Sequence, residues 1–181
     1  MTELALIAAS AHRDELAEFE RLMRRYERQV LVTSLRLLGN LEDAQDASQE
    51  VFVRLYRNLR GLEDQDDCAG WLYRVTVNVC RDLRRKRPPP ETAGGDEAIA
   101  DTAPDALAQL EQSERQRLLA LVLGSLPEKE RTALVLRDLE GLPTREVAVI
   151  LGSSEATVRS QVSQGRQRIR AAMEKLLGRR R

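Results

Sequence analysis

The sequence is poor in the residues that build catalytic and metal sites. It has one histidine, two cysteines and one tryptophan among 181 residues. Cys68 and Cys80 stand apart with no CxxC motif, so a zinc site and a disulfide framework are both disfavoured. The sequence contains no phosphate-binding loop, nucleophile elbow or metal-ligand spacing, which makes an enzyme the weakest functional class. We expect neither a metal nor a cofactor.

Aromatic residues and long apolar runs are also scarce. Aromatic side chains make up 3% of the chain, whereas hydrophobic residues of all kinds make up 42%. The cores must therefore be built from leucine, valine and alanine, a composition typical of packed helices. No apolar run approaches the roughly 18 residues of a membrane span, and the N-terminus lacks the basic start of a signal peptide. We expect a soluble, cytoplasmic protein with no membrane insertion.

Net charge is absent as well, because 29 basic residues balance 29 acidic ones. The charges are nevertheless unevenly placed. Basic residues gather at Arg81–Arg87 and again between Glu155 and Arg181, and an acidic stretch lies between these two runs. Locally concentrated positive charge attracts nucleic acid, although a single run of this kind is more often only a solvated surface.

Residues 88–112 divide the chain into two parts. Three consecutive prolines at 88–90 stop any helix, and glycines and a further proline follow. The segment is acidic and has few apolar side chains to offset the entropy of ordering it. We predict a flexible acidic linker there, with an ordered surface loop as the alternative. The remaining chain divides into an N-terminal extension (1–13), a first helical domain (14–87) and a second (113–181).

Apolar residues recur at helical spacing in both halves. The N-terminal half predicts three helices: one ends near Gly39, the next is capped by Asn40 and closed by Gly61, and the third carries Trp71 toward the core. Two further helices precede Gly141 in the second half. Because no convincing period-two alternation occurs, we predict an all-α fold of two small helical domains, with no sheet.

Residues 142–169 have the form of a helix-turn-helix, which places one helix in the major groove of DNA. Gly152 sits where the first helix must end, because only glycine takes a left-handed backbone at no steric cost. Ser154 is a good N-cap for the second helix. Small and basic residues share the exposed face of that second helix, and such a row suits base edges and phosphates. They are Ala156, Arg159, Ser160, Ser163 and Arg166. The alternative is a solvated hairpin that binds nothing.

The helix that carries Trp71 also has a polar face. Its members are Arg74, Asn78, Arg81, Asp82 and Arg85. An amide can donate to and accept from a base edge, and a basic helix with an aromatic side chain could hold an unstacked strand. The alternative places Trp71 in the core and lets Asn78 bond locally; for Trp71 we favour this alternative.

The second predicted helix has an acidic and amide-rich face beside its apolar stripe. The face comprises Asp43, Asp46, Gln49, Glu50 and Val53. It suits a basic partner protein, although Glu50 and Arg54 could equally form only an i,i+4 ion pair. Periodicity does not choose between the two.

Two parts of the chain resemble a known family. Leu41–Leu59 and Ala69–Arg87 resemble region two of bacterial RNA polymerase sigma factors, and Leu126–Arg170 resembles region four. The order of the motifs and the short linker are those of the extracytoplasmic-function group. The resemblance implies a sigma factor that binds core polymerase, recognises the minus-ten and minus-thirty-five promoter elements and promotes strand opening.

The resemblance also implies roles for particular residues. Core polymerase binding falls to Asp43, Asp46, Gln49, Glu50 and Phe52. Recognition of the minus-ten element and its melted strand falls to Arg74, Asn78, Arg81, Asp82, Arg84 and Arg85. Binding of the minus-thirty-five duplex falls to Ser154, Ala156, Thr157, Arg159, Ser160, Ser163 and Arg166. An anti-sigma protein is a further expected partner.

Two rival functions remain open from the residues. One is a helix-turn-helix regulator that binds duplex DNA without acting as a polymerase subunit. The other is a helical interaction protein with no nucleic-acid role.

Within the helix-turn-helix the sequence also departs from the family. Pro143 replaces the usual serine, so Thr144 is expected to cap the first helix one position later, and Gly165 replaces the usual alanine, which should weaken the second helix by about 1 kcal/mol.

Overall fold

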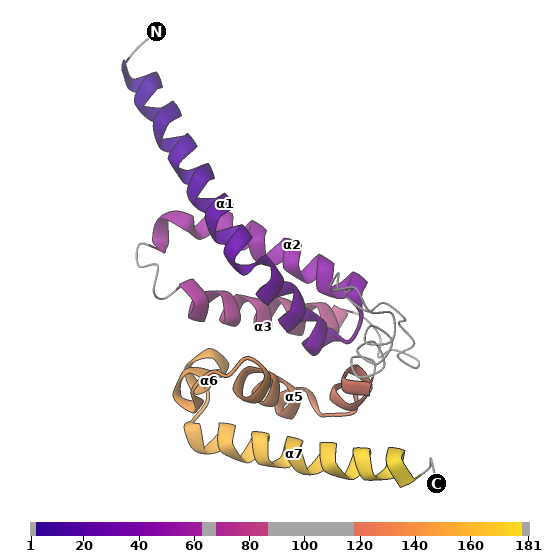
Figure 1. The fold of residues 1–181 in the computed structure, drawn as a ribbon. Helices are drawn as coiled ribbons and strands as arrows, with labels where there is room; N and C mark the ends of the chain where they lie inside the picture. The colour runs from indigo at the N-terminus through magenta and orange to yellow at the C-terminus, as the bar shows by residue number, and fades with distance from the viewer. Residues whose placement is uncertain (1–2, 63–67, 87–117, 179–181) are drawn as a thin grey trace.

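The computed structural model describes residues 3–62, 68–86 and 118–178, apart from the side chains of 3–12 and 176–178. The described residues form helices joined by short turns, with no strand among them (Figure 1). This confirms the predicted all-α fold. The linker predicted at 88–112 and the arginines at 179–181 lie outside the described residues.

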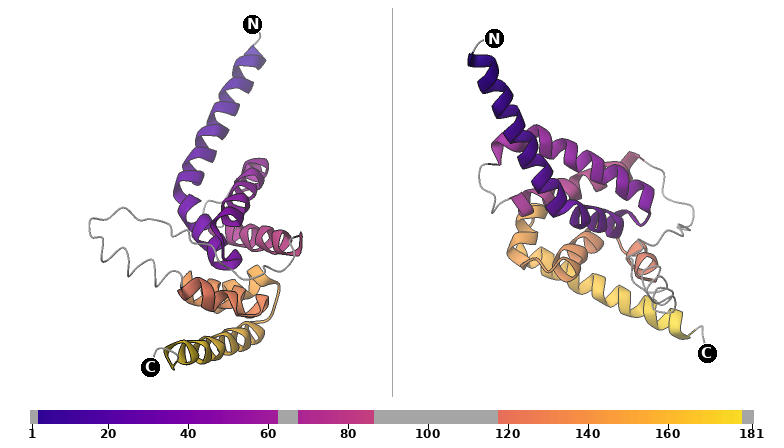
Figure 2. Two further views of the ribbon diagram at one scale, coloured as in Figure 1. Left: turned by 90° about the vertical axis from the view of Figure 1, so that its right-hand side faces the viewer. Right: turned by 45° about the horizontal axis from the view of Figure 1, so that its top comes forward.

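The N-terminal half consists of three helices that pack on one another. They are α1 (Glu3–Leu38), α2 (Leu41–Asn58), followed by a 3-10 turn at Leu59–Gly61, and α3 (Cys68–Lys86). Ala47, Val51, Leu55 and Leu72 are completely buried where the three helices meet. The N-terminal turns of α1 project beyond the other helices (Figures 1 and 2), and α1 runs without a break through residues 13 and 14, so the proposed extension continues the first helix.

The C-terminal half stacks two layers of helices. A helical segment at 118–124 leads into α5 (Glu128–Leu134) and a π turn (Val135–Leu139), and α6 (Thr144–Leu151) and α7 (Glu155–Gly178) follow. Helix α7 packs against α5 and α6 on the side away from α3, so it is the outermost layer of the molecule (Figures 1 and 2).

The predicted helix ends are formed by the expected residues, with one exception. The Asn40 side chain accepts from the backbone N–H of Asp43 at 2.8 Å, and Gly152 closes α6 with φ of 60°. Ser154 Oγ accepts from the backbone N–H of Thr157 at 3.1 Å. The expectation that Thr144 caps α6 is wrong. The N-cap position of α6 is occupied by Pro143, which has no side-chain acceptor, and Thr144 is the first residue of the helix, where its hydroxyl accepts from Arg137 Nε at 3.3 Å.

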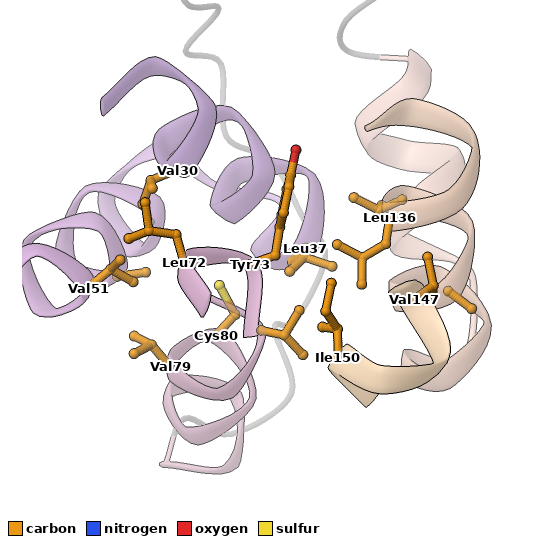
Figure 3. Packing of buried hydrophobic residues seen from close by; sticks show 14 of the residues in the cluster. Val30, Leu37, Val51, Leu72, Tyr73, Val79, Cys80, Leu136, Val147 and Ile150 are labelled. Carbon is orange, nitrogen blue, oxygen red and sulfur yellow. The ribbon is translucent and has the colours of Figure 1, made fainter. Parts of the chain in front are cut away.

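The two halves of the chain pack against each other through a common hydrophobic core. Figure 3 shows Leu37 and Tyr73 of the N-terminal half facing Leu136 and Ile150 of the C-terminal half. All four are buried, and α3 lies directly against α6. The sequence predicted two domains joined by a linker; the structure adds a packed interface between them.

Candidate nucleic-acid interface

The face of α7 predicted to bind duplex DNA is open to solvent. Its members are all exposed: Ala156, Arg159, Ser160, Ser163 and Arg166. Val158 and Val162 are buried on the opposite side, where α7 meets α5 and α6. Because α7 is the outermost layer, this face, which we call the duplex-binding face, stays open while the two halves are packed together.

Ser154 and Thr157, at the start of α7, are bonded to each other. Their hydroxyl oxygens lie 2.8 Å apart, in addition to the capping bond from Thr157 N–H. Both residues are exposed. Their hydroxyls therefore stabilise the first turn of α7, and since the bond between them uses only one of the two hydroxyl hydrogens, the other remains available to donate to DNA.

Arginines of α7 are held by carboxylates. Arg159 Nη2 lies 2.6 Å from Glu155, one turn back on the same helix. Arg166 makes two bonds to Asp138, from Nε at 2.8 Å and from Nη2 at 2.7 Å. These exposed pairs contribute little to folding stability, but they restrict where the guanidinium groups point. The bond to Asp138 also raises the pKa of Arg166, so the guanidinium stays positively charged.

The polar face of α3 is also exposed. Arg74, Asn78, Arg81, Asp82 and Arg85 all point to solvent, whereas Arg84 is half-buried. Arg81 Nε lies 3.1 Å from Glu128 of the C-terminal half, so one arginine of this face is paired with the other half of the molecule. Trp71 is half-buried against the core, as favoured from the sequence.

The acidic face of α2 differs from the prediction at one residue. Asp46 and Gln49 are exposed, and Glu50 pairs with Arg54 at 2.8 Å. Asp43, in contrast, is only 8% exposed and accepts from the side-chain amide of Asn40 at 2.7 Å. The expectation that Asp43 shares the exposed face is wrong, because the cap of α2 draws it inward. Phe52 is half-buried against the core.

A carboxylate of the C-terminal half joins three side chains of the N-terminal half. Glu140 accepts from Thr33 Oγ1 at 2.9 Å, from Arg36 Nη1 at 2.8 Å and from Tyr73 Oη at 3.2 Å. Burial, followed by the negative charge of Glu140, raises the pKa of Tyr73, so the phenol stays protonated and donates. We call this cluster the Glu140 contact.

A buried arginine strengthens the same interface. Arg131 is 4% exposed and donates to four backbone carbonyls, those of Leu37, Leu123, Gly124 and Leu126, at 2.7–3.0 Å. Burial lowers the pKa of Arg131 to about 10, and the nearby charge of Arg84 acts in the same direction. Because the Leu37 carbonyl belongs to α1, Arg131 links the end of α1 to the turn before α5.

Asp138, Glu140 and Arg131 were not singled out from the sequence. One signal could have identified the two acids. They lie at the C-terminal end of a helix, where the helix dipole disfavours a carboxylate unless a cation or donor compensates it. Arg131 carries no such signal, because an arginine within a helix is ordinary.

The described residues contain no cluster of three or more histidine, cysteine, aspartate or glutamate side chains that could hold a metal ion. None of the described helices is long and apolar enough to cross a membrane. Both cysteines are buried and form no disulfide.

Comparison with known proteins identifies the family. The family model for sigma-70 region 2 matches residues 22–88, and that for sigma-70 region 4 matches residues 116–169. The chain is 30% identical over 175 residues to the RNA polymerase sigma-H factor of Pseudomonas aeruginosa, covering 91% of each protein. It is 32% identical over 177 residues to the ECF sigma factor SigE of Mycolicibacterium smegmatis, covering 96% of this chain and 68% of that one. The chain belongs to the extracytoplasmic-function group of RNA polymerase sigma factors.

Two solved structures share the fold of this chain. CnrH, solved with the cytosolic domain of CnrY, has a TM-score of 0.66 and 26% identity, covering 94% of this chain and 96% of that one. The sigma factor RpoE of Bartonella quintana shares the fold, with a TM-score of 0.66 at 20% identity over 89% of this chain and 97% of that one. The match to both sigma regions does not favour a duplex-binding regulator that acts without polymerase. The protein is thus an RNA polymerase sigma factor.

Proposed function

We propose that this sigma factor divides its work among three exposed helix faces. The proposal rests on one observation: α2, α3 and α7 present separate polar faces, while the apolar faces of the same helices are buried in the core. Run-off transcription with purified core polymerase and a cognate promoter tests the whole function. Promoter-dependent product should require the sigma factor, and its absence with every candidate promoter would count against the proposal.

The acidic face of α2 binds core polymerase. Asp46, Gln49 and Glu50 carry this role, with Phe52 at the edge; Asp43 contributes by holding the Asn40 cap of α2 and not by contact. Charge reversal of Asp46 and Glu50 to lysine should abolish recovery of polymerase in a pull-down and leave binding of duplex DNA intact. The matched control is reversal of Glu42, which is exposed at the start of the same helix.

The polar face of α3 binds the minus-ten element and holds its melted strand. Unstacking a base costs a few kcal/mol, which polar contacts and stacking against the extruded base offset. Asn78 supplies an amide for a base edge, and Arg74, Arg81 and Arg85 supply charge. Asn78→Ala should slow strand opening on a linear promoter, monitored by permanganate footprinting, and should be rescued on a template with an unpaired minus-ten region.

The duplex-binding face of α7 binds the minus-thirty-five element, with Ser154 and Thr157 at its leading edge. Arg159→Ala together with Arg166→Ala should weaken binding to a minus-thirty-five duplex and reduce its salt dependence by roughly 2 in slope, because each phosphate contact contributes about 1. Unchanged affinity in this double variant would overturn the assignment.

The two halves separate when both promoter elements are bound. The elements are named for positions roughly 25 base pairs apart, or about 85 Å of duplex at about 3.4 Å per step, whereas the halves touch in the free protein. A fully extended segment 88–112 would span at most about 85 Å. Dyes on Arg24→Cys of α1 and Arg170→Cys of α7 should lose energy transfer when polymerase and promoter are added.

A regulatory partner and a cellular location complete the proposal. The protein acts in the cytoplasm as a specificity subunit without catalysis of its own, and an anti-sigma protein inhibits it. The RpoE neighbour was solved in complex with the anti-sigma factor NepR, which supports a partner of this kind. Co-expression with the product of an adjacent gene for a small helical or membrane-anchored protein should yield a complex that is inactive in run-off transcription.

A further inference from the structure

Asp138 holds Arg166 in a fixed plane. The Nε and Nη2 atoms of Arg166 bond to Oδ2 and Oδ1 of Asp138 at 2.8 and 2.7 Å. Parallel bonds between two planar groups fix the orientation of the guanidinium as well as its position. Arg159, by comparison, donates from Nη2 to Glu155, which lies on the same helix.

The pairing leaves one edge of the guanidinium available. An arginine has five N–H donors, and the side-on contact uses two of them. The remaining donors lie on Nη1 and on the outer side of Nη2. The Arg166 side chain is 63% exposed whereas that of Asp138 is 22% exposed, so the arginine is the more solvent-accessible partner of the pair.

Asp138 lies in the π turn that follows α5. The backbone N–H of Glu140 bonds to the carbonyl of Val135 at 2.9 Å, which inserts an extra residue into the last turn after α5. The charged residues of this turn and of its C-cap bond to separate partners: Arg137 to Thr144, Asp138 to Arg166 and Glu140 to the N-terminal half. Irregular turns of this type are frequent at functional sites.

We propose that Asp138 is a positioning residue for a phosphate contact made by Arg166. Asp138 directs the unused edge of the guanidinium toward a backbone phosphate beside the major groove, and this contact sets the register of α7 on the duplex. Phosphate contacts of this kind orient a protein and carry no sequence information themselves. Asp138 does not touch DNA. The inference rests on the proposed binding of duplex DNA by α7.

The sign of one substitution separates this role from its opposite. A carboxylate near DNA repels phosphate, so if Asp138 only screened Arg166, Asp138→Asn would tighten binding. If Asp138 positions Arg166, the same substitution weakens binding even though it removes a negative charge. A purely structural role would change the thermal midpoint and not the DNA affinity of the folded protein.

The experiment measures binding of the full chain to two duplexes of equal length over a range of NaCl concentrations. One duplex carries the minus-thirty-five element of a promoter that supports run-off transcription, and the other has a mixed sequence. The variants are Asp138→Asn, Arg166→Ala, Arg166→Lys and the double variant Asp138→Asn with Arg166→Ala. Glu174→Gln and Arg170→Ala, both at exposed positions on α7, are the matched charge controls.

We expect Arg166→Ala to weaken promoter-duplex binding about tenfold and to lower the salt slope by about 1. Asp138→Asn should weaken it about three- to tenfold with the slope unchanged. The double variant should match Arg166→Ala, because coupled residues are non-additive. Arg166→Lys should resemble Asp138→Asn, since lysine cannot make the side-on pair and also present a fixed edge.

The possible failures are distinguishable. Equal or tighter binding by Asp138→Asn, or an additive double variant, overturns the positioning role while duplex binding by α7 stands. If the wild-type protein shows no salt-dependent duplex binding, the proposed role of α7 fails, and the inference about Asp138 fails with it.

Discussion

The guanidinium of Arg36 lies 2.8 Å from the carboxylate of Glu140, across the boundary between the two halves of the sigma factor. The Glu140 side chain is only 9% exposed, so protein donors have replaced most of its water. Thr33 and Tyr73 supply the other bonds. One carboxylate therefore joins the C-terminal half to both α1 and α3.

Removing this carboxylate should loosen the interface. Glu140→Ala leaves Arg36, Thr33 and Tyr73 without their shared acceptor, and hydrogen bonds to a charged group are worth about 1.5–3 kcal/mol. We expect the free energy of unfolding in urea to fall by about 2 kcal/mol. Small-angle X-ray scattering of the folded variant should give a larger radius of gyration.

The control for Glu140→Ala is Glu146→Ala, at an exposed position on α6. This variant should keep the wild-type unfolding midpoint and radius of gyration. If Glu140→Ala also matched the wild type in both measurements, the Glu140 contact would contribute nothing to holding the halves together.

Arg131 should be irreplaceable by lysine. Lysine keeps the positive charge but has three donors on a single nitrogen, whereas the guanidinium spreads its donors over the four carbonyls. Buried carbonyls left without a donor cost about 1–3 kcal/mol. Arg131→Lys should therefore lower the free energy of unfolding by at least about 2 kcal/mol, measured by chemical denaturation. Arg145→Lys, exposed on α6, should change it by less than about 0.5 kcal/mol.

The local features of the fold could be predicted from the sequence because neighbouring residues determine them. Asn40, Gly152 and Ser154 act at helix ends through bonds or backbone angles within a few residues. The exposed face of α7 follows from helical spacing alone. Apolar periodicity cannot, however, distinguish a residue in the core of one half from one at an interface between halves. Leu37 and Ile150 satisfy the same pattern in both cases.

The helix dipole could have marked Asp138 and Glu140 themselves, but their partners were beyond prediction for another physical reason. The Glu140 contact and the Asp138–Arg166 pair each join residues at least 28 positions apart, so neither leaves a trace in local spacing. Asp138 lies in the π turn and Glu140 directly follows it. For Asp43 local spacing gave a wrong prediction. The spacing places Asp43 on the acidic face, but its bond to Asn40 draws the side chain inward.

Gly152, in the turn between α6 and α7, allows the free-energy cost of a left-handed backbone to be measured separately from steric clashes. Gly152 has φ of 60°, and a Cβ atom built there meets no atom within 4 Å. Gly152→Ala should therefore destabilise the protein by about 1–2 kcal/mol through backbone strain alone. Gly152→Asn should cost less, because asparagine visits this conformation more readily. Thermal melting of both variants checks the order, and equal midpoints would show that the turn relaxes.

Stability should decline at alkaline pH. Burial raises the pKa of Cys80 to about 12, compared with about 8.5 in an unfolded chain. Because the folded-state pKa is the higher one, the folded protein favours the neutral thiol. Its contribution is complete below about pH 8.5 and is lost as the pH rises toward 12. Urea unfolding at several pH values above 8 should show this loss.

Cys80→Ala should flatten the alkaline decline in its lower part. Above about pH 10 two groups act in opposite directions: the raised pKa of Tyr73 lowers stability as tyrosine ionises in the unfolded chain, whereas the lowered pKa of Arg131 raises it. The same burial predicts that iodoacetamide modifies Cys80 at pH 8 only after denaturation. Modification of the native protein at the rate of a free thiol would show that the site opens readily.

Gly165 lowers the helix propensity of α7, but its lack of a side chain also permits close packing against α5. It is buried where α7 crosses α5, and a Cβ atom there would lie 3.1 Å from Leu134 Cδ1 and 3.6 Å from the Glu130 carbonyl oxygen. Alanine would gain about 1 kcal/mol of helix propensity, but Leu134 must shift by a few tenths of an ångström. We expect Gly165→Ala to change the free energy of unfolding by less than about 1 kcal/mol. Gly165→Val adds further atoms at the close approach to α5, so it should destabilise by about 2 kcal/mol and weaken duplex binding as α7 is pushed away.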